Sequence, residues 1–528
     1  MEKRKSGLRG ALGVVGLGAL FALSHNKGIL YESNETTKLL HGIAGSGGGY
    51  LGKDWFVNTV DPLPIFSRFV GFTYRTLGEA GFYLYYALLL GVFCAAAAAL
   101  FVPRAPEGGA PAGAERARRP LFLAFLFLYF SHVVGSCLEA VLGFDPARIL
   151  QNGVAEQYLL GPLFQNSLFG VFLVLSIPLF FRGRRLWASL SIALACTIHS
   201  AYLFGGAALT IAFLLILLRE EGGLRKAAVF GSLTLALVLP IVVYNQGIFA
   251  SASPEEARRA LEILVVERIP HHSLPAVWFD AEAVVKILVV AAAVFAERKK
   301  PLGLVLAVPF AFGAAGALAQ VATGSYALAL LAPWRVSVFL VPLSVMALAR
   351  AGIDALLAKW PAFFRERSRA VSAACALVVA ACAAGGALSQ VGRFAEASRS
   401  PERALFSYVA ESKGPTDLYL VPPRATALEE FRIRAGAPIV VNWKSHPYGS
   451  LEVLEWYDRN QRVGRFYAAP DAAGAAAALG DLVARYGVTQ VLVASEGGGS
   501  GGPPERALEA AGAAREFGAG GYALYRLP

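Results

Sequence analysis

Two aspartates near the amino end of the chain have the chemistry of a general base. Asp54 follows Gly-Lys and precedes Trp-Phe, and Asp61 precedes Pro-Leu-Pro, within a polar segment of residues 25–75. A carboxylate held where water is partly excluded can have its pKa adjusted for proton abstraction. The alternative is structural: Asp54 caps a short helix and Asp61 starts a turn before Pro62. The sequence does not separate the two aspartates, so both stay candidates.

Seven further polar residues at the ends of apolar stretches are candidates for substrate binding: Glu156, Tyr158, His199, Arg268, His271, His272 and Arg335. Arg268 and Arg335 can hold a phosphate or pyrophosphate, because a guanidinium group offers planar bidentate donors. Interfacial snorkelling of the long side chains is the alternative. We expect no metal site, because adjacent histidines rarely bind one metal and no HExxH or HxH spacing occurs. Hydrogen bonds to substrate or to Glu156 are expected for the histidines instead.

The elements that must position these residues follow from a rhythm in the chain. Long apolar runs alternate with short polar segments as far as residue 369, and Lys/Arg clusters fall in every second polar segment. By the positive-inside rule the basic segments, among them 104–119 and 297–300, lie in the cytoplasm. Ionisable groups at membrane depth are costly unless they face a cavity or a partner. We therefore expect a polar cavity that opens on the opposite side.

About 11 apolar stretches approach the roughly 20 residues that a helix needs to cross a bilayer. They centre near residues 17, 91, 127, 173, 192, 210, 238, 289, 311, 341 and 380. The fifth and sixth share one short stretch, so two short crossings and a re-entrant hairpin are both open. The first is interpreted as an uncleaved anchor, because no clear small-residue cleavage site follows it. An odd count with the N-terminus inside places the C-terminus outside.

Composition also indicates a membrane protein. The chain is 56% hydrophobic and 16% charged, which is more apolar than a soluble protein of this length. The net charge of +11 comes largely from the predicted cytoplasmic segments, so it indicates contact with membrane lipids rather than nucleic acid. The five cysteines contain no CxxC pair, which argues against a disulfide framework and a thiolate metal site. No cofactor is firmly implied.

The chain changes character near residue 390. β-rich runs near residues 417, 437, 488 and 522 alternate with helical patterns over 451–463 and 472–487. We predict a transmembrane domain of residues 1–390, with a long first extracytoplasmic loop over 25–75, and a soluble extracytoplasmic α/β domain of residues 391–528. Trp443 and its aromatic neighbours can form a carbohydrate platform. The helical spacing of residues 452, 455 and 456 favours ordinary packing on a sheet instead.

The segment GGGYLGK at 47–53 imitates two phosphate-binding patterns, GxGxxG and GxxxxGK. Asp54 stands where a P-loop needs Ser or Thr, and neither match follows a strand of a βαβ unit. We therefore expect these glycines to shape a loop rather than to bind a nucleotide.

Six segments together carry a resemblance to the GT-C superfamily of integral membrane glycosyltransferases: GKDWFVNTVDPLPIF, AEQYLLGPLFQNSLFG, TIHSAYL, RIPHHSLP, APWRVS and, in the tail, VVNWKSHPYGSLEVLEWYDR. They are also similar to a bacterial family of GT-C-like proteins of uncharacterised function. The resemblance covers nearly the whole chain. It implies a GT-C-like bundle in the plasma (inner) membrane with an external α/β tail.

The resemblance implies transfer of a sugar from a polyprenyl-phosphate donor to an acceptor on the extracytoplasmic face. Asp54 or Asp61 would act as base, Arg335 and Arg268 would neutralise the leaving phosphate, and His199 or His271 would assist. The adjacent acidic pair common in the superfamily's first loop is absent, because the two aspartates stand apart. The alternative is therefore a catalytically inactive scaffold that docks a protein partner through its outer face and its tail. A secondary transporter is a third option, for which the sequence offers no symmetry of halves.

Overall fold

The computed structural model describes residues 2–102, 115–144, 146–248, 253–494 and 501–528. The predicted cytoplasmic segment at 104–119 therefore lies outside the described residues up to residue 114. The pattern of contacts divides the chain into two compact units. Unit 1 holds residues 1–28, 82–244 and 269–391, and unit 2 holds residues 29–81, 245–268 and 392–528. The last boundary follows Val391, beside the change in character near residue 390.

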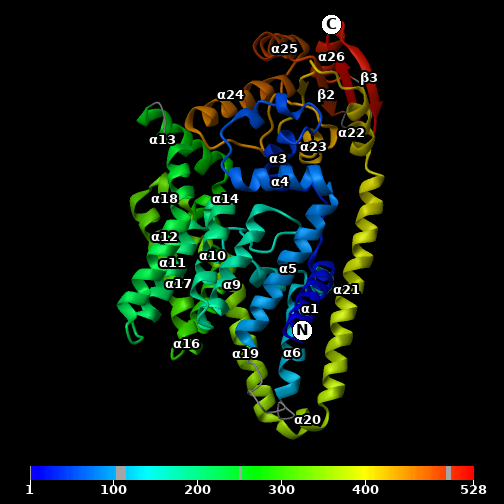
Figure 1. Cartoon of the computed structure of the whole chain (residues 1–528). Coiled ribbons are helices and arrows are strands. Elements are labelled where there is room, and N and C mark those ends of the chain that lie inside the picture. The colour runs from blue at the N-terminus through cyan, green and yellow to red at the C-terminus, as the bar shows by residue number, and fades with distance from the viewer. Residues whose placement is uncertain (1, 103–114, 145, 249–252, 495–500) are drawn as a thin grey trace. The chain divides into compact units, whose positions relative to one another are not determined.

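Unit 1 is built from helices. Its first half contains α1 (Glu2–His25), most of α5 (Ala80–Phe101), α6 (Glu115–Phe130), α7 (His132–Leu142), α8 (Pro146–Gln151), η3 (Asn166–Gly170), α9 (Val171–Phe181), α10 (Arg185–Ile198), η4 (Ser200–Tyr202), α11 (Leu203–Leu217) and most of α12 (Gly223–Ile248). Its second half contains α14 (Pro270–Ser273), α15 (Pro275–Trp278), α16 (Ala281–Glu297), α17 (Pro301–Thr323), α18 (Tyr326–Leu331), η6 (Pro333–Val336), α19 (Ser337–Lys359), α20 (Pro361–Glu366) and most of α21 (Ser368–Ser398). Figure 1 shows α19 and α21 as long helices joined through the short α20.

Six helical segments in the described chain are long and apolar enough to cross a membrane: Ala80–Phe101, Ser200–Leu217, Gly223–Ile248, Pro301–Thr323, Tyr326–Lys359 and Ser368–Ser398. A seventh is added if α6 and α7, which bend by 61° at their junction, count as one span. The chain is thus a helical protein with several candidate membrane spans. All the expected centres fall inside helices, but Gly13–His25, Asn166–Phe181 and Arg185–Ile198 are shorter apolar helices. The expected count of about 11 therefore remains a prediction.

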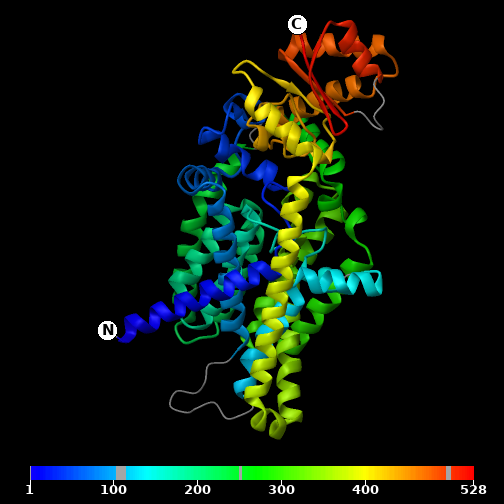
Figure 2. The ribbon, with the colours of Figure 1, turned by 90° about the vertical axis from the view of Figure 1, so that its right-hand side faces the viewer.

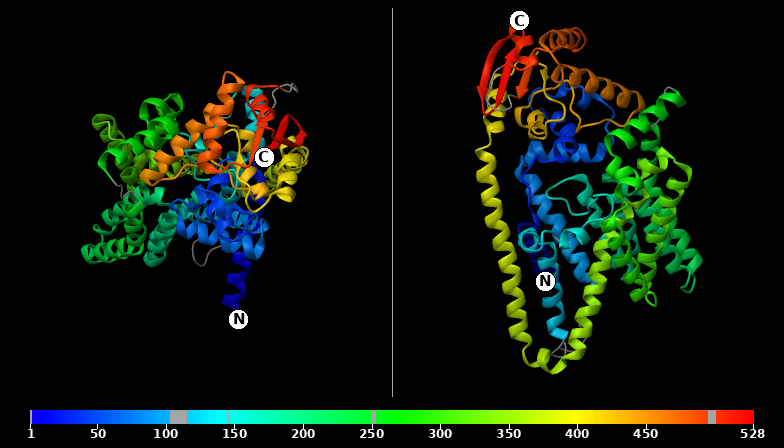
Figure 3. Two further views of the ribbon diagram at one scale, coloured as in Figure 1. Left: turned by 90° about the horizontal axis from the view of Figure 1, so that it is seen from above. Right: turned by 180° about the vertical axis from the view of Figure 1, so that it is seen from behind.

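The interior of unit 1 is apolar and aromatic. Phe180 and Phe213 stack with ring centroids 4.0 Å apart, and Phe230 meets both rings edge-on. Phe21 of α1 packs edge-on against Phe127 and Phe130 of α6. Figure 3 (right) shows these parts of unit 1 from behind, with α1 in dark blue, α6 in cyan and α19 and α21 in yellow-green to yellow. Such contacts add packing energy to the burial of apolar area, so they fix the helices that carry the polar residues described below.

Unit 2 combines three stretches of chain. From the first come α2 (Glu35–Lys38), α3 (Leu40–Gly45), η1 (Leu51–Lys53), η2 (Phe56–Asn58) and α4 (Pro64–Leu77), and from the second α13 (Pro254–Glu262) and the π-helix η5 (Ile263–Arg268). The third provides α22 (Pro401–Ser412), η7 (Thr426–Leu428), α23 (Phe431–Ala435), α24 (Ser450–Tyr467), α25 (Ala472–Tyr486) and α26 (Pro503–Ala510), together with four strands.

The strands form one mixed sheet in the order β1-β2-β4-β3. Their bounds are Tyr419–Leu420, Gln490–Ala494, Tyr522–Arg526 and Ala514–Ala519, respectively. β1 is parallel to β2, and β4 is antiparallel to both of its neighbours, with Leu492 opposite Leu524. β3 turns into β4 through Gly520 and Gly521, both with positive φ, which is the backbone that a tight hairpin turn needs. The expected run near residue 437 contributes only a bridge between Ile439 and Tyr419.

The core of unit 2 lies between the sheet and α22 with α23. It contains Leu405, Phe406, Val409, Tyr419, Val421, Leu428, Phe431, Ala435, Ala437, Ile439, Leu492 and Leu524. Figure 2 shows α22, in yellow, on one side of the strands and the orange to red helices on the other. The short α23 therefore has one side fixed by the core, and this fixes the direction of its arginines.

The glycines of segment 47–53 shape a loop of unit 2. Gly47 and Gly49 have φ of +87° and +56°, the left-handed region in which a side chain is strained. A Cβ on Gly49 would lie 2.4 Å from the carbonyl oxygen of Gly436, and Tyr50 N donates to that same oxygen over 2.8 Å. Glycine is needed here so that the backbone of the first stretch can approach the third.

Candidate functional site

A polar cluster of unit 1 joins three elements at points where apolar helices begin or end. Asn166 starts η3, His199 follows α10, and Arg335 lies in η6 within the candidate span Tyr326–Lys359. Nη1 of Arg335 lies 3.2 Å from Nε2 of His199, and the Asn166 amide lies 2.8 Å from Nδ1 of the same ring. We call these three residues the unit 1 polar cluster.

The ring of His199 lies between two nitrogen groups. The Arg335 guanidinium, which has only donors, faces Nε2, and the amide nitrogen of Asn166 faces Nδ1. Tyr202 meets the ring edge-on, with centroids 5.0 Å apart. The ring is therefore held from three directions, and Arg335 is oriented through it.

Three other predicted residues of unit 1 lie beside a second set of contacts. Nδ1 of His272 lies 2.7 Å from the carbonyl oxygen of Ala155, and Nε1 of Trp334 donates to the carbonyl of His272 over 2.9 Å. Glu156 is exposed, and it follows Ala155 in the left-handed region, with φ of +54° and +60°. The ring of His271 is tilted by 51° against that of His272, with the centroids 4.1 Å apart. Because Trp334 precedes Arg335, these contacts also position η6.

Tyr158 belongs to the same region of unit 1. Its hydroxyl accepts a hydrogen bond from Nε2 of Gln165, the residue before Asn166, over 3.1 Å. The turn before it requires a glycine at 153, because a Cβ there would lie 2.4 Å from Oγ of Ser337. The structure thus gathers Glu156, Tyr158, His199, His272 and Arg335 in one unit, along three short elements and one turn.

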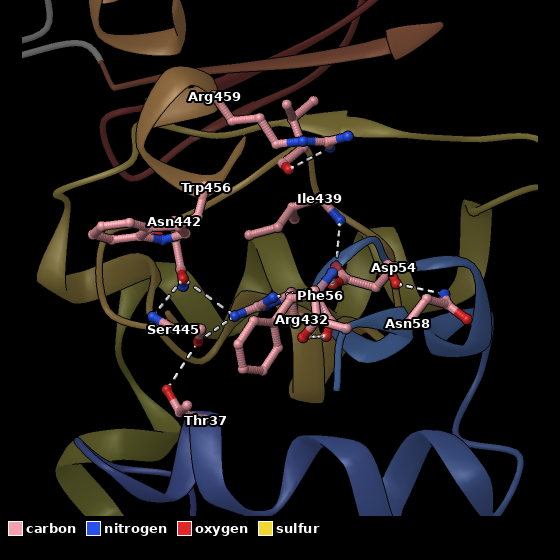
Figure 4. Close-up of polar contacts among 12 residues, drawn as sticks. Thr37, Asp54, Phe56, Asn58, Arg432, Ile439, Asn442, Ser445, Trp456 and Arg459 are labelled. Carbon is pink, nitrogen blue, oxygen red and sulfur yellow. Dashed lines mark hydrogen bonds and ion pairs between the residues drawn. The ribbon is translucent and has the colours of Figure 1, made fainter. Parts of the chain in front are cut away.

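In unit 2, Asp54 is fully buried and its carboxylate is saturated with hydrogen bonds. Oδ1 accepts from Phe56 N at 3.0 Å and from Nη1 of Arg432 at 3.1 Å, while Oδ2 accepts from Ile439 N at 3.0 Å. Figure 4 shows the Arg432 guanidinium beside Asp54, with the Phe56 ring nearby. Both oxygens of this carboxylate are occupied by donors of the chain itself, so it is poorly placed to contact a substrate hydroxyl.

Arg432 extends this ion pair into a network. Its Nη2 donates to Oδ1 of Asn442 and to Oγ of Ser445, and Ser445 Oγ lies 2.8 Å from Oγ1 of Thr37. Burial lowers the pKa of Arg432, and Asp54 opposes that shift. Two buried opposite charges with further hydrogen bonds make a tie between distant parts of the sequence. We call Thr37, Asp54, Arg432, Asn442 and Ser445 the ion-pair network.

Asp61 has a different environment from Asp54. It is half-buried, and its Oδ1 accepts from Leu63 N over 2.8 Å in the turn that precedes α4. Burial lowers the pKa of His41, and Asp61 is the charge that opposes this most. Asp61 therefore combines an Asx turn with a neighbouring imidazole, whereas Asp54 is an ion-pair partner.

Arg268 lies at the end of η5 in a basic cluster of unit 2. Its Nη2 donates to the carbonyl of Lys444 over 2.9 Å, and burial lowers the pKa of both residues. Lys38 stands 5.7 Å from the ring centroid of Tyr448. Glu429, 4.0 Å from Nζ of Lys444, is a distant counter-charge. Three cations with one paired carboxylate leave an excess of positive charge, which attracts anions. We call Lys38, Arg268, Lys444 and His446 the basic cluster.

His446 is the neutral member of this cluster. Burial lowers its pKa well below the usual value, and Arg268 and Lys38 lower it further. The Lys444 backbone opposes the shift, although no hydrogen bond of normal geometry reaches either ring nitrogen. Packing holds the ring instead, since it lies 5.1 Å from Tyr448 and 6.1 Å from Trp456.

The aromatic residues of the tail do not form an open platform. The Trp443 ring is tilted against Trp456 at 4.7 Å, and the guanidinium of Arg424 lies 4.0 Å from its centroid. Trp456 is fully buried and donates to the carbonyl of Asn442 over 3.0 Å. Packing thus takes up the ring of Trp456 on its helix, whereas the ring of Trp443 stays half-buried.

Sequence reasoning missed Asn166, His41 and Arg432. Asn166 lies in a quoted segment (FQNSLFG) but carries no charge, and Arg432 is one arginine of the unremarkable FRIRAG. Within the described residues, no group of three or more His, Cys, Asp or Glu side chains is arranged to hold a metal ion.

The comparisons with known proteins bear on the tail alone. A family described as "Domain of unknown function (DUF6798)" matches residues 400–463, which include Arg432, Asn442 and Ser445. No curated protein matches the chain. The matched segment of this chain thus contributes three of the five members of the ion-pair network.

Proposed function

We propose that this chain is a GT-C-type membrane glycosyltransferase that moves a sugar from a polyprenyl-phosphate donor to an acceptor on the extracytoplasmic face. The observation that supports this most is Arg335, which lies in a candidate membrane span and is held by His199 and Asn166. An ionisable side chain at membrane depth is costly and usually functional. The proposal includes the full expected topology, with about 11 spans, the N-terminus in the cytoplasm and the C-terminus outside.

In the proposed reaction, the acceptor hydroxyl oxygen forms a bond to the anomeric carbon of the donor sugar. The bond from that carbon to the phosphate oxygen breaks, and its electron pair leaves with the polyprenyl phosphate. Arg335 binds that phosphate, because a guanidinium with a fixed plane offers two parallel donors. The hydroxyl proton passes to a carboxylate. Arg268, with the other cations of the basic cluster, suits the same class of anion.

Of the two aspartates, we propose Asp61 as the base. Asp54 already accepts three hydrogen bonds and pairs with Arg432. Asp61 accepts a backbone hydrogen bond from Leu63, lies near an imidazole and, unlike Asp54, is only half-buried. A general base must be within hydrogen-bond reach of its proton, so the half-buried carboxylate is the better candidate.

The test is binding of a polyprenyl phosphate to the full chain in nanodiscs, with the uncharged polyprenol as the comparison ligand. We expect the phosphate to bind more tightly, and Arg335→Met to weaken its binding by about tenfold or more while polyprenol binding is unchanged. Arg298→Met is the matched control, because Arg298 lies over Phe295 outside the cluster. Equal binding of the two lipids, or unchanged binding by Arg335→Met, would contradict the proposal.

The second candidate function is a non-catalytic scaffold, and the saturated carboxylate of Asp54 favours it. The Asp61→Asn variant distinguishes the two candidates in a transfer assay, with membrane extracts as the source of donor and acceptor. If the chain is a transferase, this variant forms no product but still binds the polyprenyl phosphate. A scaffold forms no product even as the wild type. It instead binds a protein partner, and this binding is unchanged by Arg335→Met.

A further inference from the structure

Unit 2 contains a groove of about 420 Å³ between the loop after β1 and one face of α24. The residues that bear on its chemistry are Pro422, Pro423, Arg424, Trp443, Gln461 and Gly464. The groove mixes apolar faces with a few polar groups, and its size is that of a small-molecule site. None of the residues that line it is acidic.

Arg424 gives the groove its charge. Its guanidinium group lies over the ring of Trp443, 4.0 Å from the ring centroid, which restrains the side chain. In the described part of the chain, no carboxylate pairs with Arg424. Arg268 lies within electrostatic reach and adds to the positive field. A guanidinium held over an aromatic ring still offers N–H donors to a carboxylate, sulfate or phosphate.

Gly464 keeps one wall of the groove open. It stands inside α24, where glycine destabilises a helix relative to alanine. A Cβ at this position would meet no atom within 4 Å, so close packing does not explain the glycine. Any side chain here would instead take up space in the groove. The absence of a side chain at Gly464 thus leaves space in the groove where α24 faces the loop with Pro422 and Pro423.

We propose that this groove binds an anionic saccharide, with the acidic group of one sugar residue held by Arg424. A sugar ring has an apolar C–H face for Pro422 and Pro423, and hydroxyls for the amide of Gln461. A simple inorganic anion would not need the apolar walls. A peptide strand would need an unpaired strand edge, but β1 pairs with β2 and with Ile439 on its two sides. This site is independent of the transferase reaction proposed above.

The experiment is binding of the full chain in nanodiscs to an array of uronate-bearing, sialylated and phosphorylated oligosaccharides with their neutral counterparts. We expect at least one acidic class to bind and its neutral counterpart to bind at least about tenfold more weakly, the cost of a lost charged hydrogen bond. Arg424→Gln is expected to cause a similar loss. Gly464→Phe is expected to abolish binding, because the ring fills the groove.

Gly480→Phe is the matched control. Gly480 is also inside a helix with no atom within 4 Å of its Cβ position, but it is exposed on α25 outside the groove. The Gly480→Phe variant should bind the acidic saccharide as tightly as the wild type does. The proposal is overturned if no acidic saccharide binds, if Gly464→Phe binds normally, or if neutral and acidic forms bind alike. The proposal would also be overturned if the groove bound a proline-rich peptide that no saccharide displaced.

Discussion

The ion-pair network and the basic cluster are neighbours in unit 2 and treat charge in opposite ways. In the first, Arg432 meets a carboxylate at 3.1 Å, and an amide and a hydroxyl accept its other donors. In the second, Lys444 lies 4.0 Å from Glu429, and Arg268 and Lys38 add further positive charge around a neutral histidine. Ser445 stands between Lys444 and His446 in sequence and yet belongs to the first. Charge that is neutralised inside the chain holds structure together, whereas charge left in excess is available for an external anion.

The largest effect is expected from breaking the ion pair. Arg432→Met should lower the free energy of unfolding by about 3–5 kcal/mol, because it leaves the buried Asp54 carboxylate without its partner. Urea unfolding of the purified protein, followed by intrinsic fluorescence, measures the loss. The double variant Asp54→Leu with Arg432→Met should recover part of it. A loss below about 1 kcal/mol, or strict additivity of the two changes, would show that the pair is not a structural tie.

The next largest effect is a pH dependence from the basic cluster. The pKa of His446 is lowered in the folded state, so the unfolded state binds more protons below its ordinary pKa. The contribution of His446 to the free energy of unfolding is therefore fully present above about pH 6.5. As the pH drops below this value, the contribution decreases by up to roughly 1.4 kcal/mol per pH unit. His446→Phe, which keeps the ring contacts but cannot titrate, should flatten the loss between pH 7 and pH 5.5. An unchanged slope would assign the acid sensitivity elsewhere, for instance to His41, whose pKa is also lowered.

A smaller effect sharpens the network itself. Ser445→Ala removes the hydroxyl that links Arg432 to Thr37, so we expect a loss of about 1 kcal/mol. The same unfolding experiment measures it, and Thr37→Val should cost a similar amount. If both changes together cost no more than either alone, the hydroxyl pair acts as a single link. No loss from either would exclude a role for it.

The smallest expected effect has the opposite sign. Lys38→Met removes one of the cations near Lys444 and His446 and should leave stability unchanged or raise it by up to about 0.5 kcal/mol. The comparison with Arg432→Met is direct, because both changes replace a cation with methionine. A loss above about 1 kcal/mol by Lys38→Met would erase the contrast between the two regions.

The sequence predicted local features better than distant pairings. Apolar periodicity located the helices of unit 1, and β-rich runs near residues 417, 488 and 522 contain β1, β2 and β4. β3 was missed because its sequence, AREFGA, lacks a run of β-branched residues. Asp54 and Asp61 look alike in sequence, and what separates them is Arg432, which stands 378 residues beyond Asp54. A partner at that separation leaves no periodic signal.

The composition of unit 2 also sets the order in which the chain can fold. Residues 29–81 are synthesised early, but the arginine that neutralises Asp54 comes from α23, after all the candidate spans. During synthesis, Asp54 therefore precedes the partner of its ion pair by 378 residues of chain. A ribosome stalled before α23 should hold a nascent chain whose first polar segment is still open to protease. Unit 2 can therefore form this ion pair only after most of the chain has been synthesised.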